Sequence, residues 1–326
     1  MRSTWDGQGS AADALVQIFS SQVAKARECI GEDARLTDKE VHNARKALKR
    51  ARSTLRLLRP ALTSDIFEQT NFALRDTGQP LSHLRDSRII QDSLDTLRKH
   101  FGDLTQQLDL RELETALHSQ CVQARRELTV NSARFHELRR TLSTIEAEAK
   151  HWHLERDGWK LLGSALRRIY RHARVAYARV QEANSDGRLH EWRKQIKHLG
   201  HALQILTPMH PGHLGELADQ ANTLTEYLGE DHDLAVLGKY LHDSVVDADE
   251  ESLDVLERLV QRRRADLQER AFRVGERLLN LKTQRFLKQM KQCYMNSEVA
   301  EPRSGENDQR IPRKKHQAQE APLRTQ

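Results

Sequence analysis

Two segments that lie far apart in the chain carry the same pattern of histidine, arginine and lysine. Residues 41–60 and 189–208, aligned without gaps at an offset of 148, are identical at seven of twenty positions. The shared polar residues follow the spacing His-x-x-Arg-Lys-x-x-Lys. They are His42/His190, Arg45/Arg193, Lys46/Lys194 and Lys49/Lys197. Self-similarity at a fixed offset indicates a duplicated structural unit.

Helical geometry places these residues on one face of each segment. At about 100° per residue, the first copy adds Arg52 and Arg56 to that face, and the second copy adds His201. No acidic residue occurs between positions 41 and 60. Because like charges spaced four residues apart destabilise a helix, such a row of cations indicates an anionic ligand. The alternative is a basic surface that solvent and salt screen.

A third segment repeats the theme, with three arginines on one helical face and tyrosines beside them. These arginines are Arg167, Arg171 and Arg174. Arginine presents a planar fork to phosphate oxygens, lysine a compact charge, and histidine a charge that depends on pH. Rows of fixed cations suit an extended, evenly charged chain better than one small phosphate. The sequence therefore predicts a binding site for a long polyanion.

The elements that must position these side chains are predicted to be helices, since no sustained period-2 alternation occurs. Thr37 and Glu40 match a capping box, and Pro60 marks the end of the helix that follows. The predicted helices cover residues 10–29, 37–60, 63–76, 84–100, 105–128, 133–150, 156–183, 188–206, 214–228, 231–244, 249–280 and 283–294. A second matching pair, 81–94 and 228–241, supports two repeats, 1–150 and 151–296. Residues 297–326 are polar and rich in proline, and are predicted to form a disordered tail.

Composition limits the other classes of function. The 326 residues carry a net charge of +6, and the mean hydropathy is −0.75. No stretch approaches the roughly 20 apolar residues that a membrane helix needs, and no signal-peptide pattern follows Met1. The three cysteines are far apart and have neither metal-site nor disulfide-framework spacing. We expect a soluble, cytoplasmic protein with free thiols and no membrane partner.

The repeated segments, together with residues 81–90, 165–180, 228–237 and 275–286, resemble the CHAD family, a helical domain named for its conserved histidines. The resemblance covers about residues 10–294. It implies an all-α fold of two antiparallel four-helix bundles related by a pseudo-twofold axis, with a basic cavity or channel between them. It also implies binding of inorganic polyphosphate and association with polyphosphate granules.

The resemblance carries this binding role onto the basic residues of both repeats and adds Arg85, Lys282 and Arg285. This chain departs from the family pattern in the second copy, where Gly200 stands opposite Arg52. The Arg85-Asp86 pair of the first half becomes His232-Asp233 in the second. The second face is therefore less cationic, and the halves can contribute unequally.

Several other patterns in the sequence could indicate an enzyme or a metal site. Residues 146–150 spell Glu-x-Glu-x-Lys, a motif of triphosphate tunnel enzymes, but helical spacing would splay the two carboxylates about 200° apart. No histidine pair has a third metal ligand nearby, so we expect no metal and no cofactor. His42 and His190 are assigned to the anion site, with a hydrogen-bonded core histidine as the alternative. Asp86 and Asp233 could be catalytic, but a structural role is the preferred interpretation.

We expect a polyphosphate-binding module without catalytic activity of its own. One rival is a non-specific nucleic-acid binder, against which only 5% of residues are aromatic. RNA or DNA should still compete weakly. The other rival is a metal-dependent phosphohydrolase acting on polyphosphate or nucleotides. The preferred chain length of the ligand, the oligomeric state and any protein partner are not readable from the sequence.

Overall fold

The computed structural model describes residues 4–31, 36–129, 132–243 and 249–299. It gives no side-chain detail for residues 82–88, 121, 124–129, 132–133 and 298–299. Within this described part every regular element is a helix, which confirms the predicted all-α class. The first half contains α1 (Ala11–Cys29), α2 (Asp38–Leu58), the 3-10 turn η1 (Arg59–Ala61), α3 (Ser64–Gly78), α4 (Pro80–Phe101), α5 (Asp103–Gln106), α6 (Arg111–Thr129) and α7 (Ser132–Ala149).

The second half repeats the central part of this order. It contains α8 (Gly158–Glu182), α9 (Asp186–Leu206), η2 (Thr207–Met209), α10 (Pro211–Asp243), α11 (Glu250–Leu279) and α12 (Thr283–Val299). Each bound of α9 and η2 lies 148 positions after the corresponding bound of α2 and η1. The offset found between the basic segments is therefore also the offset between the helices that carry them.

Local sequence explains where α2 begins and ends. Thr37 accepts a hydrogen bond from the backbone N–H of Glu40, and the Glu40 carboxylate accepts one from the backbone N–H of Thr37, at 2.7 Å. This is the predicted capping box. At the other end, Pro60 stands in η1 directly after α2, as Pro208 stands in η2 after α9. Because proline lacks a backbone N–H, it does not continue the helix.

The two halves differ where the first is broken and the second is continuous. Two helices were predicted at 214–228 and 231–244, but one unbroken helix, α10, covers both. In the first half Pro80 separates α3 from α4, whereas the second half has no proline between Pro211 and the end of α10. Gly229, at the predicted break, lies buried in mid-helix, in close approach to the guanidinium of Arg193. The predicted break was wrong because this residue packs inside one continuous helix.

The last helix is longer than predicted. α12 runs to Val299, and Ser297, which was predicted to begin the polar tail, is buried within it. The Ser297 carbonyl accepts a hydrogen bond from the side chain of Gln8 at 2.6 Å. The remainder of the predicted tail, residues 300–326, lies outside the described residues.

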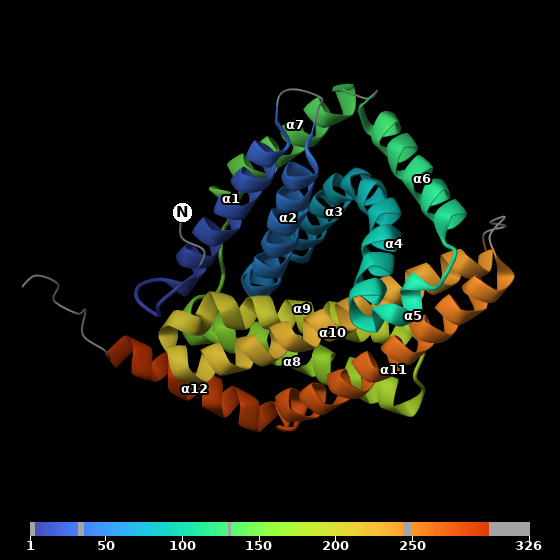
Figure 1. The fold of residues 1–326 in the computed structure, drawn as a ribbon. Coiled ribbons are helices and arrows are strands. Elements are labelled where there is room, and N and C mark those ends of the chain that lie inside the picture. Colours follow the sequence, from blue (N-terminus) through green and yellow to red (C-terminus); the bar gives the residue numbers. More distant parts are fainter. Residues whose placement is uncertain (1–3, 32–35, 130–131, 244–248, 300–326) are drawn as a thin grey trace, which may run out of the picture.

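Figure 1 shows how the helices are arranged. α8, α9 and α10 lie side by side, with α11 and α12 along one side of them and α1–α4 on the other. One apolar core is shared by α1, α2, α8, α9 and the first part of α10. A second core joins α4, α6, α11 and the second part of α10. The basic helices α2 and α9 contact each other directly.

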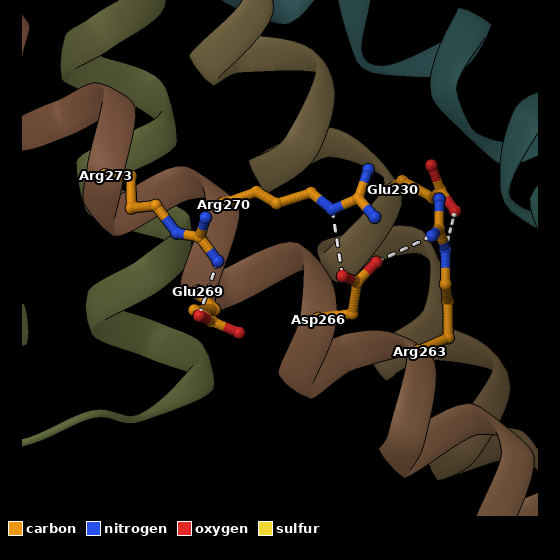
Figure 2. A network of polar contacts seen from close by, with 6 residues as sticks. All are labelled: Glu230, Arg263, Asp266, Glu269, Arg270 and Arg273. Atoms are coloured by element: carbon orange, nitrogen blue, oxygen red, sulfur yellow. Dashed lines mark hydrogen bonds and ion pairs between the residues drawn. The ribbon is translucent and has the colours of Figure 1, made fainter.

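Four arginines of α11 are paired with carboxylates. Figure 2 shows Arg263 bonded to Glu230 and Asp266, Arg270 to Asp266, and Arg273 to Glu269, at distances of 2.5–2.9 Å. The fourth, Arg264, donates to Asp231 at 3.0 Å. The sequence places carboxylates within reach of each of these cations, so this helix shows how a neutralised basic face is built.

We expect Asp231→Ala to lower the free energy of unfolding by about 3 kcal/mol, because it leaves the nearly buried Arg264 without its inner carboxylate. The Asp231 side chain is 2% exposed and also accepts a hydrogen bond from Gln268 at 2.8 Å. The control is Glu269→Ala, which breaks an exposed pair and should cost less than about 0.5 kcal/mol. Urea unfolding of both variants would measure the difference, and equal losses would contradict it.

Candidate anion-binding site

A hollow of 510 Å³ lies between the basic faces of α2 and α9. Nine of the residues predicted from the sequence line it, four from α2 and five from α9. They are Arg45, Lys49, Arg52, Arg56, His190, Arg193, Lys194, Lys197 and His201. Residues that come from the two repeats thus face a common space.

The amphipathic pattern of each helix explains this orientation. On α2 the face opposite the cations is buried in the shared core, through residues such as Ala44, Ala51 and Leu55. On α9 the same role falls to Trp192, Leu199 and other apolar residues. Burial of these apolar faces fixes the rotation of each helix and leaves the basic face toward the hollow.

The hollow is strongly and unevenly charged. Among the described residues its lining contains eight Arg and Lys residues, four His residues and one carboxylate, Asp233. Two of these cations also pair with carboxylates outside the lining, Lys194 with Glu191 at 2.5 Å and Arg75 with Asp76 at 2.9 Å. Electrostatic repulsion among the cations must be offset by the rest of the fold, and an anion in the hollow would relieve it.

Hydrogen bonds to neutral groups orient two of the arginines. Arg52 Nε donates to the side-chain oxygen of Asn71 on α3 at 3.2 Å. Arg56 Nη1 donates to the backbone carbonyl of Arg52 at 2.9 Å. Because these acceptors carry no net charge, they position the guanidinium groups without neutralising them. Such fixed cations suit phosphate oxygens, which accept paired N–H donors.

Burial and neighbouring cations lower the pKa values of two arginines on α2. Burial lowers the pKa of Arg56 to about 10, and the neighbouring charges of Arg52, Arg59 and Arg168 act in the same direction. The pKa of Arg52 is lowered by burial and then by Arg75. A guanidinium whose charged form is disfavoured to this degree gains from any anion placed beside it.

Three histidines of the hollow have pKa values below the ordinary value. Burial lowers the pKa of His201 to about 4, with Arg50, Lys197 and Lys49 adding to the effect. Burial and then Arg56 place the pKa of His198 well below its ordinary value of 6.5. The pKa of His190 is lowered by burial and by the charge of Arg193. An anion would raise all three values, so its binding should take up protons.

We expect the ligand-free protein to lose stability as the pH falls from about 6.5 towards 4. The folded pKa of His201 is about 4, whereas its unfolded value is 6.5, so the unfolded chain binds a proton that the folded chain excludes. His201 alone should account for roughly 1–2 kcal/mol at pH 5. Thermal melts of the wild type and of His201→Asn at pH 7.5 and 5.0 would measure this contribution.

The control for this measurement is His153→Asn, which removes an exposed histidine outside the hollow. The His201→Asn variant should lose less stability than the wild type between the two pH values, and His153→Asn should behave as the wild type does. An identical pH dependence in all three proteins would contradict the assignment.

Two further hollows adjoin the first. One of 830 Å³ is lined by His42 and Lys46 together with Arg45, Lys49 and His201, and also by three carboxylates, Asp38, Asp92 and Glu226. Another of 480 Å³ also shares Arg45 and Lys49 and extends to Arg75 on α3. The shared lining residues make the three hollows adjacent along α2. The eleven basic residues predicted on α2 and α9 therefore all lie along this series of hollows.

Other predicted residues lie elsewhere. The lining of these three hollows does not include Arg167, Arg171 and Arg174 on α8, or Lys282 and Arg285 near α12. The α8 arginine that affects the α2 row is the neighbouring Arg168, through its charge on Arg56 and Arg59. Arg85 lies in α4 among the residues whose side chains are not described. A binding role for these six residues stays a prediction.

Three basic residues of the described lining were not among the predicted site residues: Arg75, His198 and His232. Arg75 comes from α3, outside the repeated pattern, where it also pairs with Asp76 at 2.9 Å. His198 stands opposite Arg50 in the alignment, which was the available signal. Its Nδ1 lies 3.3 Å from the hydroxyl oxygen of Ser53, so it bridges α9 to α2.

The structure also shows where the acidic motif at residues 146–150, the two repeated histidines and the cysteines lie. Glu146 lies in the helix α7 and pairs with Arg27 at 3.2 Å, so Glu-x-Glu-x-Lys does not stand on a strand. His42 and His190 are exposed, and the alternative of core histidines is therefore wrong. Cys29 and Cys293 are free thiols, as predicted, while the Cys121 side chain is not described. Among the described helices none is long and apolar enough to cross a membrane.

Comparison with known proteins identifies the family. The CHAD domain model matches residues 17–242, and the chain therefore belongs to the CHAD domain family. The match ends before α11, whereas the resemblance read from the sequence extended to residue 294. No match was found among curated proteins.

Two solved structures share the fold. The crystal structure of the CHAD domain from the plant Ricinus communis has a TM-score of 0.57 at 17% identity, and the match covers 87% of this chain and 96% of that one. PptA from Streptomyces chartreusis has a TM-score of 0.55 at 14% identity, covering 82% and 100%. At these identities the likeness concerns the fold alone.

Proposed function

We propose that this protein binds inorganic polyphosphate along the hollows between α2 and α9 and performs no chemistry on it. The observation that carries the proposal is the convergence of basic faces from both sequence repeats on one hollow, whose described lining holds eight Arg and Lys residues and one carboxylate. Membership of the CHAD family supports it, because that resemblance implied this ligand. In this proposal the protein acts in phosphate storage or in organising polyphosphate granules in the cytoplasm.

The arrangement of the cations favours a chain over a small anion. Eight Arg and Lys side chains exceed what one phosphate group can contact, and the adjoining hollows along α2 extend the charged surface. In this proposal the halves form two bundles related by a pseudo-twofold axis, and the hollows form a continuous channel between them. The shared 148-residue offset of α2 and α9 supports that symmetry.

The lining also favours polyphosphate over nucleic acid. The central hollow is lined by no Phe, Tyr or Trp among the described residues, so it offers no aromatic platform for a base. Nucleic acids share the phosphate charge and should compete, but without the added stacking energy. Polyphosphate carries its charges closer together, which suits this density of cations.

The test is a competition experiment on the purified full chain. Labelled long-chain polyphosphate is bound at near-physiological salt and displaced with orthophosphate, tripolyphosphate, RNA or DNA at equal phosphate concentration. We expect unlabelled polyphosphate to displace the label at a concentration at least about tenfold lower than RNA or DNA. Equal displacement by RNA would make the hollow a general polyanion surface. Release of orthophosphate that depends on Mg²⁺ or Mn²⁺ would overturn the non-catalytic part.

A further inference from the structure

A smaller cavity adjoins the basic hollows and is lined by Thr4 and by residues of α1, α2 and α9. Its volume is 150 Å³, and none of the described residues that line it is acidic. His201 also lines two of the basic hollows and is the single residue that this cavity shares with them. The cavity therefore adjoins the proposed polyphosphate path through one histidine side chain.

The cavity is large enough to hold more than a single water molecule. A single water needs roughly 10–15 Å³ of such volume, so a polyatomic group fits. The position is closed towards α1 by the core residue Ile18, which is 2% exposed. A ligand that reaches the cavity from the basic hollows therefore meets a buried wall and ends there.

Gln22 on α1 supplies an unsatisfied acceptor. Its side chain is 5% exposed and lines the cavity. Its Oε1 is buried and has no hydrogen-bond partner within the described structure. A buried carbonyl oxygen without a donor is costly, so a ligand that brings a hydrogen-bond donor to it is favoured.

The other polar groups that line the cavity determine which kind of ligand can bring a hydrogen-bond donor to Gln22. Arg50 contributes a cation, and the Thr54 hydroxyl is already used in donating to the Arg50 carbonyl at 3.0 Å. Gln204 Nε2 donates to Asn222 Oδ1 at 2.8 Å, so its Oε1 faces His201 Nδ1 as an acceptor, at 3.4 Å. The proton of the neutral His201 ring therefore sits on Nδ1, and Nε2 keeps a lone pair.

A ligand for this cavity must offer a negative oxygen to Arg50 and an O–H to Gln22. Inner phosphate groups of polyphosphate carry no O–H, whereas a terminal phosphate or orthophosphate carries one in its monoprotonated form. We propose that the cavity binds a monoprotonated, terminal-type phosphate group, whose negative oxygen faces Arg50 and whose single O–H donates to Gln22 Oε1. If the phosphate group is the end of a polyphosphate chain, the proposal rests on the proposed function. If it is free orthophosphate, it does not.

The experiment uses calorimetric titration of the full chain with three probes: orthophosphate, linear tripolyphosphate and cyclic trimetaphosphate, which has no chain end. The variants are Gln22→Leu and Arg50→Gln. Gln22→Leu removes the unsatisfied oxygen and keeps the buried volume, so it should melt at or above the wild-type temperature. The readout is the ratio of linear to cyclic affinity in each protein, which cancels most of the general charge effect.

We expect both variants to lower this ratio by about tenfold while leaving cyclic trimetaphosphate binding within about twofold. Loss of orthophosphate binding in Gln22→Leu would assign the cavity to the free anion, and an effect confined to linear chains would assign it to chain ends. An unchanged ratio, with no orthophosphate binding that depends on Gln22, overturns the proposal. Long-chain binding, tested separately with Lys49→Glu/Lys197→Glu, decides the proposed function independently.

Discussion

The double variant Lys49→Glu/Lys197→Glu is expected to bind long-chain polyphosphate at least about 100-fold more weakly than the wild type. Both lysines line the central hollow, one from each repeat. Two charge-assisted contacts would be lost and two repulsive carboxylates introduced, which together should cost about 3 kcal/mol or more. Fluorescence anisotropy with labelled polyphosphate at near-physiological salt would measure the change.

The fold should survive this substitution. Glutamates in the hollow would lessen the repulsion that lowers the pKa values of its histidines, so the melting temperature should stay equal or rise. The matched control is Lys25→Glu/Lys160→Glu, which changes the net charge by the same amount at exposed positions outside the hollows. Comparable loss of binding in both variants would mean that only the overall charge matters.

Salt should weaken polyphosphate binding steeply. Each phosphate contact contributes a slope of roughly −0.7 in a plot of log K against log salt for a single-stranded polyanion. If four or more of the eight Arg and Lys residues of the hollow engage the chain, the slope should be steeper than about −3. Affinity would then fall by about a thousandfold or more between 0.05 and 0.5 M salt.

The slope of log K against log salt also gives the number of phosphate contacts. The Lys49→Glu/Lys197→Glu variant should show a slope shallower by about 1–2, while Lys25→Glu/Lys160→Glu should keep the wild-type slope. Titrations in KCl at four salt concentrations would supply the values. A wild-type slope shallower than about −1 would contradict binding through rows of cations.

Much of this architecture could be predicted because its signals are local. Thr37 and Glu40 cap α2, Pro60 and Pro208 follow the basic helices, and alternating basic and apolar faces orient them. The repeat favoured a ligand site over a screened basic surface, which a single basic helix could not do, because the same histidine and cations recur at an offset of 148. The residues predicted on α2 and α9 consequently all lie along the hollows.

What could not be predicted depends on packing between distant segments. Three arginines on one face of α8 formed a regular pattern, but the tertiary arrangement brings Arg168, one position away, towards Arg56. The break predicted between residues 228 and 231 is absent, because Gly229 packs inside α10 in close approach to Arg193. Gln22 lies on the buried face of the amphipathic helix α1, and its unsatisfied oxygen is visible only once α1 has packed against α2.

The central claim is that α2 and α9 form one site for one chain. Calorimetric stoichiometry with polyphosphate of a defined short length tests it most directly, in Lys49→Glu and Lys197→Glu measured singly. For a shared site, each single variant should weaken all of the binding and leave the wild-type stoichiometry unchanged. If each variant instead removes half of the binding sites and leaves the other half at wild-type affinity, the two faces bind separately and the account is contradicted.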